Sequence, residues 1–355
     1  MSLAAAFRPP IVGLDIGSSG VRCVALRQGR RGWSLAGAGE APLPLLPNDD
    51  GRDGAGPDTV EVAGAIRQAM ENVRMPRARV AAALCGHVIV KRLSLPAMDR
   101  AALAEAIPWE AEQYIPFDLA DVHLDYQVVK SGGTPDMMDV LLVAARKDRI
   151  DDRTSVIEQA GRQPVILDVE AFALCNAYQV NYPDRSNPLA AIVHVGRSTT
   201  IACFLENGQP AFTRDISIGG RLYAETLQRE LGVDAVTAER IQRGQIPSEV
   251  SREQALGLLR DASAQLILEI RKTVDFYRAT APVEKLSRVV VSGGACGAEG
   301  LVEMLTAEFG APVDVFDPFR RIAKPKGPVG PLGVDASGPA YSVAVGLALR
   351  REGDR

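Results

Sequence analysis

The chain has 355 residues, a length that suits two domains of ordinary size better than a single core. Hydrophobic residues make up 46% and charged residues 24%, which excludes wholesale disorder. The net charge of −4 argues against a dedicated nucleic-acid binder, because such proteins use a net basic face to contact phosphates.

Five cysteines are scattered along the chain without a Cys-x-x-Cys pair, which argues against structural zinc and against a disulfide framework. No apolar run approaches the roughly 20 residues that span a bilayer. The first residues lack the apolar core of a secretory signal. We therefore expect a cytoplasmic protein that reaches a membrane only through a partner.

The first half of the chain alternates strand-like and helical stretches, which favours an α/β fold. In chain order we expect strands at 11–16, 21–26 and from 33, a helix at 59–74, strands at 80–84 and 88–95, a helix at 99–114, paired strands at 122–129 and 139–145, a helix at 148–160, a strand at 165–168 and a helix from 171.

The second half repeats the opening of the first. Residues 191–208 align without a gap on residues 12–29, and both read as strand, Gly-x-Ser turn, strand and glycine turn. The alternative is a coincidence between two ordinary hairpins, but the match in register indicates a duplicated lobe. Beyond the repeat we expect helices from 221, near 234, at 251–278, from 299 and at 341–349, and a strand at 288–292.

Each Gly-x-Ser turn directs several backbone N–H groups toward one point, an arrangement that binds phosphate oxygens. Gly17 and Gly196 have no Cβ, so the backbone can approach a phosphate closely. Two such turns that face each other across a cleft would hold a triphosphate from both sides.

Asp15 lies near the end of an otherwise apolar strand, where an ionised carboxylate is costly unless it is paired or near a metal. In the functional interpretation it organises Mg²⁺ through water, since Mg²⁺ keeps several waters and takes few protein ligands. The alternative is a structural aspartate that closes the turn by a hydrogen bond to the backbone.

Three motifs occur in this order: DIGSSGVR (15–22), VHVGRSTT (193–200) and VVVSGGACGAEGL (289–301). They resemble the actin, Hsp70 and sugar-kinase ATPase superfamily. Together with EAEQYIPFDLADVHLDYQVV, DVEAFALCNAYQVN and FTRDISIGG, the segment GLDIGSSGVRCVAL looks like the PilM family of cytoplasmic, actin-like type IV pilus assembly proteins. The resemblance covers nearly the whole chain.

The resemblance implies an actin-like (ribonuclease H-like) α/β ATPase fold of two duplicated lobes, with a small inserted domain like that of PilM and the division protein FtsA. It places the first lobe at 1–88 and 164–189, the inserted domain at 89–163 and the second lobe at 190–355, with an outer subdomain at about 220–287. The implied ligands are ATP with Mg²⁺ in the cleft and the N-terminal cytoplasmic peptide of PilN, a protein of the pilus inner-membrane complex. Nucleic acid and direct membrane insertion are not expected.

Carried over by position, the resemblance also assigns the residues of the nucleotide site. The phosphate loops are Gly17, Ser18 and Ser19, with Arg22 as a forked donor, and Gly196, Arg197, Ser198 and Thr199. Gly219 and Gly220 open a helix near the ribose and phosphates, and Gly293 and Gly294 let the adenine lie against the backbone.

Two residues bear on catalysis besides Asp15. By resemblance, Glu170 orients the attacking water. Alternatively, it is a carboxylate at a helix N-terminus that interacts favourably with the positive end of the helix macrodipole. His194 stands where the superfamily usually has Asp in the second hairpin, and a neutral imidazole cannot balance Mg²⁺ as a carboxylate does. We therefore expect ATP binding with slow or absent hydrolysis, and His194 as a satisfied core histidine.

Two other functions remain open on the same fold. A sugar or acetate kinase would need a substrate base in the cleft, for which the sequence shows no motif. A division scaffold like FtsA would end in an amphipathic membrane helix, and the final residues ALALRREGDR lack an aromatic membrane face.

The inserted segment carries Trp109, Tyr114, Ile115 and Phe117, more apolar side chains than so small a unit can bury by itself. We expect the PilN peptide at the seam between this insertion and the first lobe.

Overall fold

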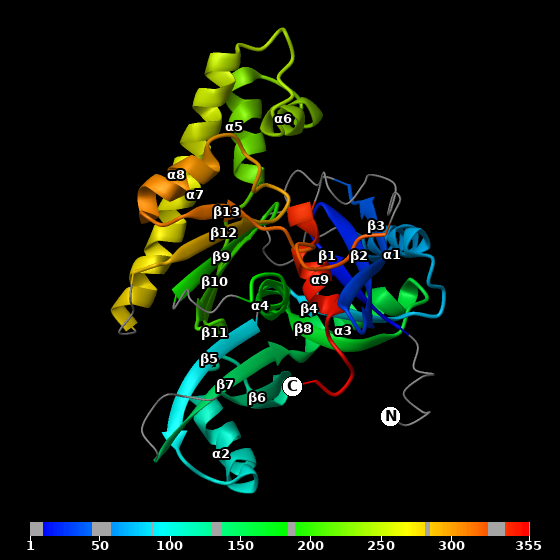
Figure 1. Ribbon diagram of the computed structural model, residues 1–355, viewed down its shortest axis with the longest axis vertical. Coiled ribbons are helices and arrows are strands. Elements are labelled where there is room, and N and C mark those ends of the chain that lie inside the picture. The colour runs from blue at the N-terminus through cyan, green and yellow to red at the C-terminus, as the bar shows by residue number, and fades with distance from the viewer. Residues whose placement is uncertain are drawn as a thin grey trace.

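The computed structural model describes residues 10–44, 58–86, 88–129, 136–183, 189–280, 285–325 and 338–354. Within them lie two five-stranded sheets and one three-stranded sheet, with helices packed on and between them (Figure 1).

The first sheet has the strand order β3-β2-β1-β4-β8, in which β1 is antiparallel to β2 and parallel to β4. Its strands are β1 (Ile11–Ile16), β2 (Gly20–Gly29), β3 (Gly32–Pro42), β4 (Arg79–Leu84) and β8 (Pro164–Val169). Helices α1 (Thr59–Val73) and α3 (Lys147–Gln159) pack against Val12, Leu14 and Val80 on one face. Both faces of β1 and β4 are covered, which explains their continuous apolar runs.

The second sheet repeats this topology strand for strand, with the order β11-β10-β9-β12-β13 and the same mixture of antiparallel and parallel pairs. The duplication predicted from the two hairpins is confirmed, and it extends over five strands. The strands are β9 (Leu189–Val195), β10 (Thr200–Glu206), β11 (Gln209–Ile216), β12 (Arg288–Ser292) and β13 (Val313–Val315).

Two helices lie between the sheets and join the lobes through one shared core: α4 (Glu170–Asn181) and α9 (Ser342–Ala348). Side chains from both sheets, such as Val24 and Ile192, pack into the same cluster as these helices. The helices cross closely: a Cβ on Gly346 would lie 1.8 Å from the carbonyl oxygen of Ala173. This packing sets how the two lobes face each other.

The outer part of the second lobe is helical, as the sequence predicts. It contains α5 (Arg221–Leu231), α6 (Ala235–Gln242) and α7 (Arg252–Thr280), whereas α8 (Leu301–Phe309) connects β12 to β13. Helix α8 begins later than the expected 299, because Gly300 adopts a left-handed conformation immediately before it. The helix expected at 341–349 is divided into a 3₁₀ turn, η3 (Gly338–Tyr341), and α9.

A small sheet with the order β5-β7-β6 lies at the far end of the first lobe (Figure 1). Its elements are β5 (Val88–Pro96), α2 (Arg100–Glu112), η2 (Leu119–Asp121), β6 (Val122–Val129) and β7 (Met137–Arg146). The expected pairing of the 122–129 and 139–145 strands is confirmed. Asp99 caps α2 through the N–H groups of Ala101 and Ala102, and Leu103 and Ile107 pack on the sheet.

Candidate functional site

The two Gly-x-Ser turns have the same internal geometry and meet each other. The N–H of Gly17 donates to the oxygen of Gly20 at 3.1 Å, and the N–H of Gly196 donates to that of Thr199 at 3.0 Å. The hydroxyl of Ser198 donates to the hydroxyl of Ser18 at 3.1 Å. Residues 180 positions apart, from the two halves of the repeat, thus face each other across the lobes.

The second turn rests on the start of α5. The N–H of Gly220 donates to the oxygen of Gly196 at 2.8 Å, and a Cβ on Gly219 would lie 2.6 Å from the oxygen of Arg197. Only glycine permits this approach. The side chain of Arg197 pairs with Glu239 of α6 at 2.9 Å, so its guanidinium points to the helical subdomain.

Gly293 and Gly294 differ sharply in their surroundings. Gly293 has φ = +92°, and a Cβ there would lie 2.3 Å from the oxygen of Val195, so its backbone is packed against β9. Gly294 is exposed and has no atom within 4 Å of a Cβ position. A flat ring can therefore approach the backbone at Gly294, while Gly293 shapes the turn.

Arg22 joins two carboxylates across the first sheet. The strand register places Asp15 beside Arg22 and Arg22 beside Glu40. The Nε of Arg22 lies 3.7 Å from the carboxylate of Glu40. The neighbouring loop residue Ser19 accepts a backbone hydrogen bond from Leu43 at 3.1 Å.

Asp15 and Glu170 form the charged floor of the site. Glu170 is the first residue of α4, as the helix-terminus interpretation requires, but it is also buried near Asp15. Burial raises the pKa of Asp15 to about 6, against the lowering effect of Arg22 and Arg153. Burial, and then the charge of Asp15, raises the pKa of Glu170 to about 8. Two neighbouring carboxyl groups in a desolvated place hold protons that isolated ones would lose.

Sequence reasoning missed three residues of this floor. Arg153 of α3 donates to the oxygen of Ile16 at 3.3 Å and lies near both carboxyl groups. The Cys85 thiol forms a hydrogen bond with Glu170, and Asp215 accepts the N–H of Gly86 at 3.1 Å. Nothing in the residues around Arg153 indicates its role, because its partner Ile16 of β1 lies 137 positions earlier in the sequence. Asp215 is an exposed residue of the mixed polar and apolar strand β11, so it too carries no local signal.

His194 is a satisfied core histidine, as expected. Its Nδ1 lies 2.8 Å from the hydroxyl of Ser292, and its ring is buried. Burial, with a smaller effect of Arg22, lowers the pKa of His194 to about 4. The imidazole is therefore neutral at neutral pH.

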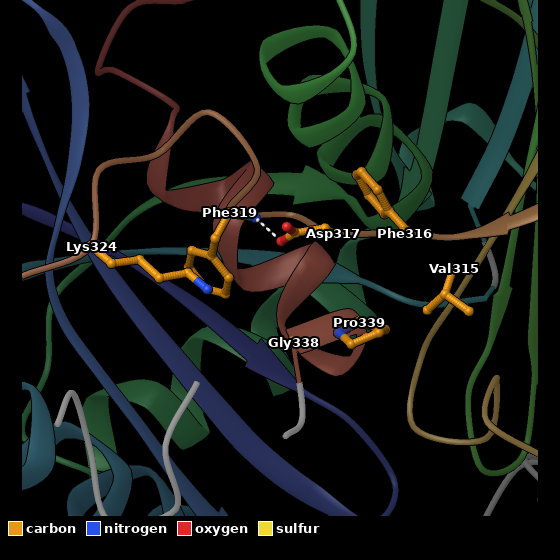
Figure 2. Close-up of a pocket in the computed structure, with 7 residues that line it drawn as sticks. All are labelled: Val315, Phe316, Asp317, Phe319, Lys324, Gly338 and Pro339. Carbon is orange, nitrogen blue, oxygen red and sulfur yellow. Dashed lines mark hydrogen bonds between the residues drawn. The ribbon is translucent and has the colours of Figure 1, made fainter. Parts of the chain in front are cut away.

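A cavity of about 190 Å³ lies beside this site (Figure 2). That volume is below the roughly 300 Å³ at which small-molecule pockets begin. One wall is Pro339, whose oxygen accepts the N–H of Gly293 at 3.2 Å. This hydrogen bond joins the Gly293 turn to the cavity wall. Its lining residues are Val315, Phe316, Asp317, Phe319, Lys324, Gly338 and Pro339.

The raised pKa of Glu170 predicts a pH-dependent effect of Glu170→Gln on stability. Because folding raises the pKa of Glu170, the protonated carboxyl group favours the folded state. This stabilisation is fully present below pH 4.5, the pKa of the group in the unfolded chain, and it is lost as the pH rises through about 8. Thermal melting at several pH values should show wild type losing stability relative to the variant between pH 5 and pH 8. A melting difference that stays constant over that range would contradict the assigned burial of Glu170.

Two duplicated lobes whose Gly-x-Ser hairpin turns meet each other define an actin-like protein with a small inserted sheet. A sequence model of the family described as "Type IV pilus assembly protein PilM" matches residues 13–352. The chain belongs to this family.

Solved structures agree on the fold. One titled "PilM-PilN type IV pilus biogenesis complex" is 24% identical, with 96% of this chain and 98% of that chain covered and a TM-score of 0.81. The ethanolamine utilization protein EutJ from Carboxydothermus hydrogenoformans is 16% identical, with 95% and 88% covered and a TM-score of 0.57. MreB5 of Spiroplasma citri bound to ADP is 14% identical, with 95% and 94% covered and a TM-score of 0.50.

In the described ranges, none of the helices combines the length and the apolar character needed to cross a membrane.

Proposed function

We propose that this chain is an actin-like component of the type IV pilus machinery that binds ATP with Mg²⁺ between its lobes. We further propose that it binds the N-terminal cytoplasmic peptide of a PilN-type protein and so lies at the inner membrane through that partner. The observation that carries the nucleotide part is the direct contact between Ser18 and Ser198 at the tips of the two repeated turns.

The contact between the serines supports a phosphate site at the two turns. A phosphoryl group bound by both turns has to replace the 3.1 Å hydrogen bond between Ser18 and Ser198, because both hydroxyl groups would then donate to phosphate oxygens. Gly219 and Gly196 keep the surrounding backbone close without side chains in the way. ATP binding therefore includes a small separation of the two turns.

The donor set fits Mg²⁺ held largely by water and phosphate. Among the described residues, no group of three or more His, Cys, Asp or Glu side chains could hold a metal ion alone. Mg²⁺ usually takes only one or two carboxylates and keeps several waters, a role that Asp15 can fill. When bound, the ion would neutralise phosphate charge and lower the pKa of the two neighbouring carboxyl groups.

Hydrolysis is expected to be slow for reasons visible in the site. Without bound Mg²⁺ the raised pKa keeps Glu170 largely protonated at neutral pH, so this carboxyl group has to lose its proton before it can orient water as an acceptor. His194, neutral beside Ser292, supplies no negative charge for a metal. These features support a nucleotide-dependent adaptor over a rapidly cycling enzyme.

The small sheet supports the peptide part of the proposal. Ile115 is buried in its core, whereas Phe117 is 38% exposed and lies under the guanidinium of Arg146 at 5.4 Å. Arg146 immediately precedes α3, which packs on the first lobe, so Phe117 lies at the predicted seam. We keep the predicted limits of the inserted domain, 89–163, as part of this proposal. The small sheet itself runs from Val88 to Arg146.

Phe117→Ala is expected to weaken binding of a synthetic PilN-type N-terminal peptide at least about tenfold, since an exposed aromatic anchor typically carries much of the energy of an interface. Calorimetry with and without ATP measures this. The matched control is Phe276→Ala, which removes a 49% exposed phenylalanine from α7 of the second lobe and should leave peptide affinity unchanged. Equal losses of peptide affinity in both variants, or direct competition between ATP and peptide, would contradict a peptide site between the inserted domain and the first lobe.

A further inference from the structure

The two repeated hairpins differ at their outer ends. In the second lobe, Glu206 pairs with Gln209, and the turn between them is Asn207-Gly208, both with positive φ. This is a preferred two-residue hairpin turn. In the first lobe, Gly29 pairs with Gly32, and the turn residues are Arg30 and Arg31.

Arg30 and Arg31 serve no visible structural purpose in that turn. The positive φ required there is taken by Gly32, at +108°. Both arginines are exposed, and within the described part of the chain neither forms an ion pair with a carboxylate. Two adjacent like charges at a hairpin tip oppose each other, so their presence indicates a function outside the fold.

Other arginines reach the same end of the hairpin from distant parts of the chain. The segment after β13 runs beside β3: the N–H of Ala323 donates to the oxygen of Trp33 at 2.9 Å, and Leu35 donates back to Ala323. That brings exposed Arg321 alongside. From beyond α9, Arg351 lies over the Trp33 ring at 5.9 Å. Together these residues form a basic patch around one tryptophan: Arg30, Arg31, Arg321, Arg351 and Trp33.

Carboxylates near the patch do not cancel it. Glu352 is already paired with Arg79 at 2.9 Å. The carboxylate of Asp354 accepts the backbone N–H of Arg351 at 2.7 Å. A chain with a net charge of −4 thus concentrates four exposed arginines around Trp33.

We propose that this basic patch binds the anionic headgroups of a phospholipid bilayer by surface contact without insertion. The arginines come from three chain segments that meet around Trp33, and their positive charge is complementary to the diffuse negative charge of a bilayer surface. Trp33 is partly buried beneath Arg351. Tryptophan side chains are favoured at the membrane–water interface, at the level of the lipid headgroups. A long polyanion such as nucleic acid would also meet the net acidic remainder of the chain. This proposal does not depend on nucleotide binding.

The test measures partition of the full chain onto sedimented vesicles. Vesicles of equal parts phosphatidylglycerol and phosphatidylcholine are compared with vesicles of phosphatidylcholine alone. Each arginine near an anionic surface strengthens binding about fivefold, so Arg30→Gln combined with Arg31→Gln should weaken it roughly 25-fold. The control Arg252→Gln with Arg278→Gln removes two exposed charges from α7 and should bind as wild type does. Thermal melting checks that both double variants remain folded.

Wild type is expected to bind only the vesicles that contain phosphatidylglycerol, and salt should weaken that binding by screening. The proposal is overturned if wild type ignores these vesicles, or if the α7 control loses as much affinity as the hairpin variant. It is equally overturned if a DNA oligonucleotide or a polyglutamate peptide displaces the protein from vesicles at comparable charge concentration, since the patch would then bind anionic polymers.

Discussion

Gly346→Ala is expected to lower the free energy of unfolding by about 3 kcal/mol or more, because the added methyl group overlaps a backbone. The new Cβ would lie 1.8 Å from the oxygen of Ala173, so α9 and α4 must separate. Rotation of a side chain cannot relieve this contact. Denaturant unfolding of the purified variant measures the loss.

The control for that prediction is Gly64→Ala in α1. A Cβ there approaches nothing nearer than the guanidinium of Arg67, at 3.9 Å, and alanine favours a helix over glycine by about 1 kcal/mol. Gly64→Ala should therefore hold or raise stability. If Gly346→Ala unfolds at the same denaturant concentration as wild type, the helices do not pack between the lobes as described.

Gly294→Val is expected to weaken ATP binding at least about tenfold while leaving the unliganded protein as stable as wild type, within about 0.5 kcal/mol. The side chain would fill the open space over the exposed backbone where the adenine is proposed to lie. Calorimetric titration with ATP and Mg²⁺ gives the affinity, and melting without nucleotide gives the stability.

Gly293→Ala provides the contrast at the adjacent position. Its positive φ and the 2.3 Å approach to the oxygen of Val195 mean that any side chain strains the turn itself, so stability and affinity should fall together. Unchanged ATP affinity in Gly294→Val would place the base elsewhere.

The sequence predicted those parts of the site that depend on local backbone geometry. Gly17 and Gly196 each lie in a short turn between two apolar strands that pair with each other. Neighbouring residues in the sequence are therefore enough to predict the backbone conformation of these turns. The repeat then implied that the turns are equivalent, and the contact between Ser18 and Ser198 agrees with that expectation.

Side-chain partners across the fold could not be predicted in this way. Arg22 and Arg197 were assigned to phosphate, and the structure pairs them with Glu40 and Glu239. Nothing near either arginine in the sequence identifies its partner, since the pairing depends on strand register in one case and on the position of α6 in the other. Their role toward phosphate stays a prediction, and a phosphate would have to compete with these carboxylates.

The pairing of β5 was missed for a related reason. Strands 122–129 and 139–145 are close in sequence, so their pairing was expected, whereas β5 joins β7 from more than forty residues away. Tertiary packing decides which edge of a strand pairs with a strand from a distant part of the sequence. The alternation of polar and apolar residues along the strand does not specify that edge.

The central claim, that ATP with Mg²⁺ binds between the two turns, is tested most directly by thermal melting of the full chain with and without saturating nucleotide. A ligand at 100 times its dissociation constant stabilises the folded state by about 2.7 kcal/mol, which should raise the melting temperature by several degrees. Asp15→Ala should reduce that rise if Asp15 organises the ion. A wild-type melting curve that does not move at saturating ATP and Mg²⁺ would contradict the account.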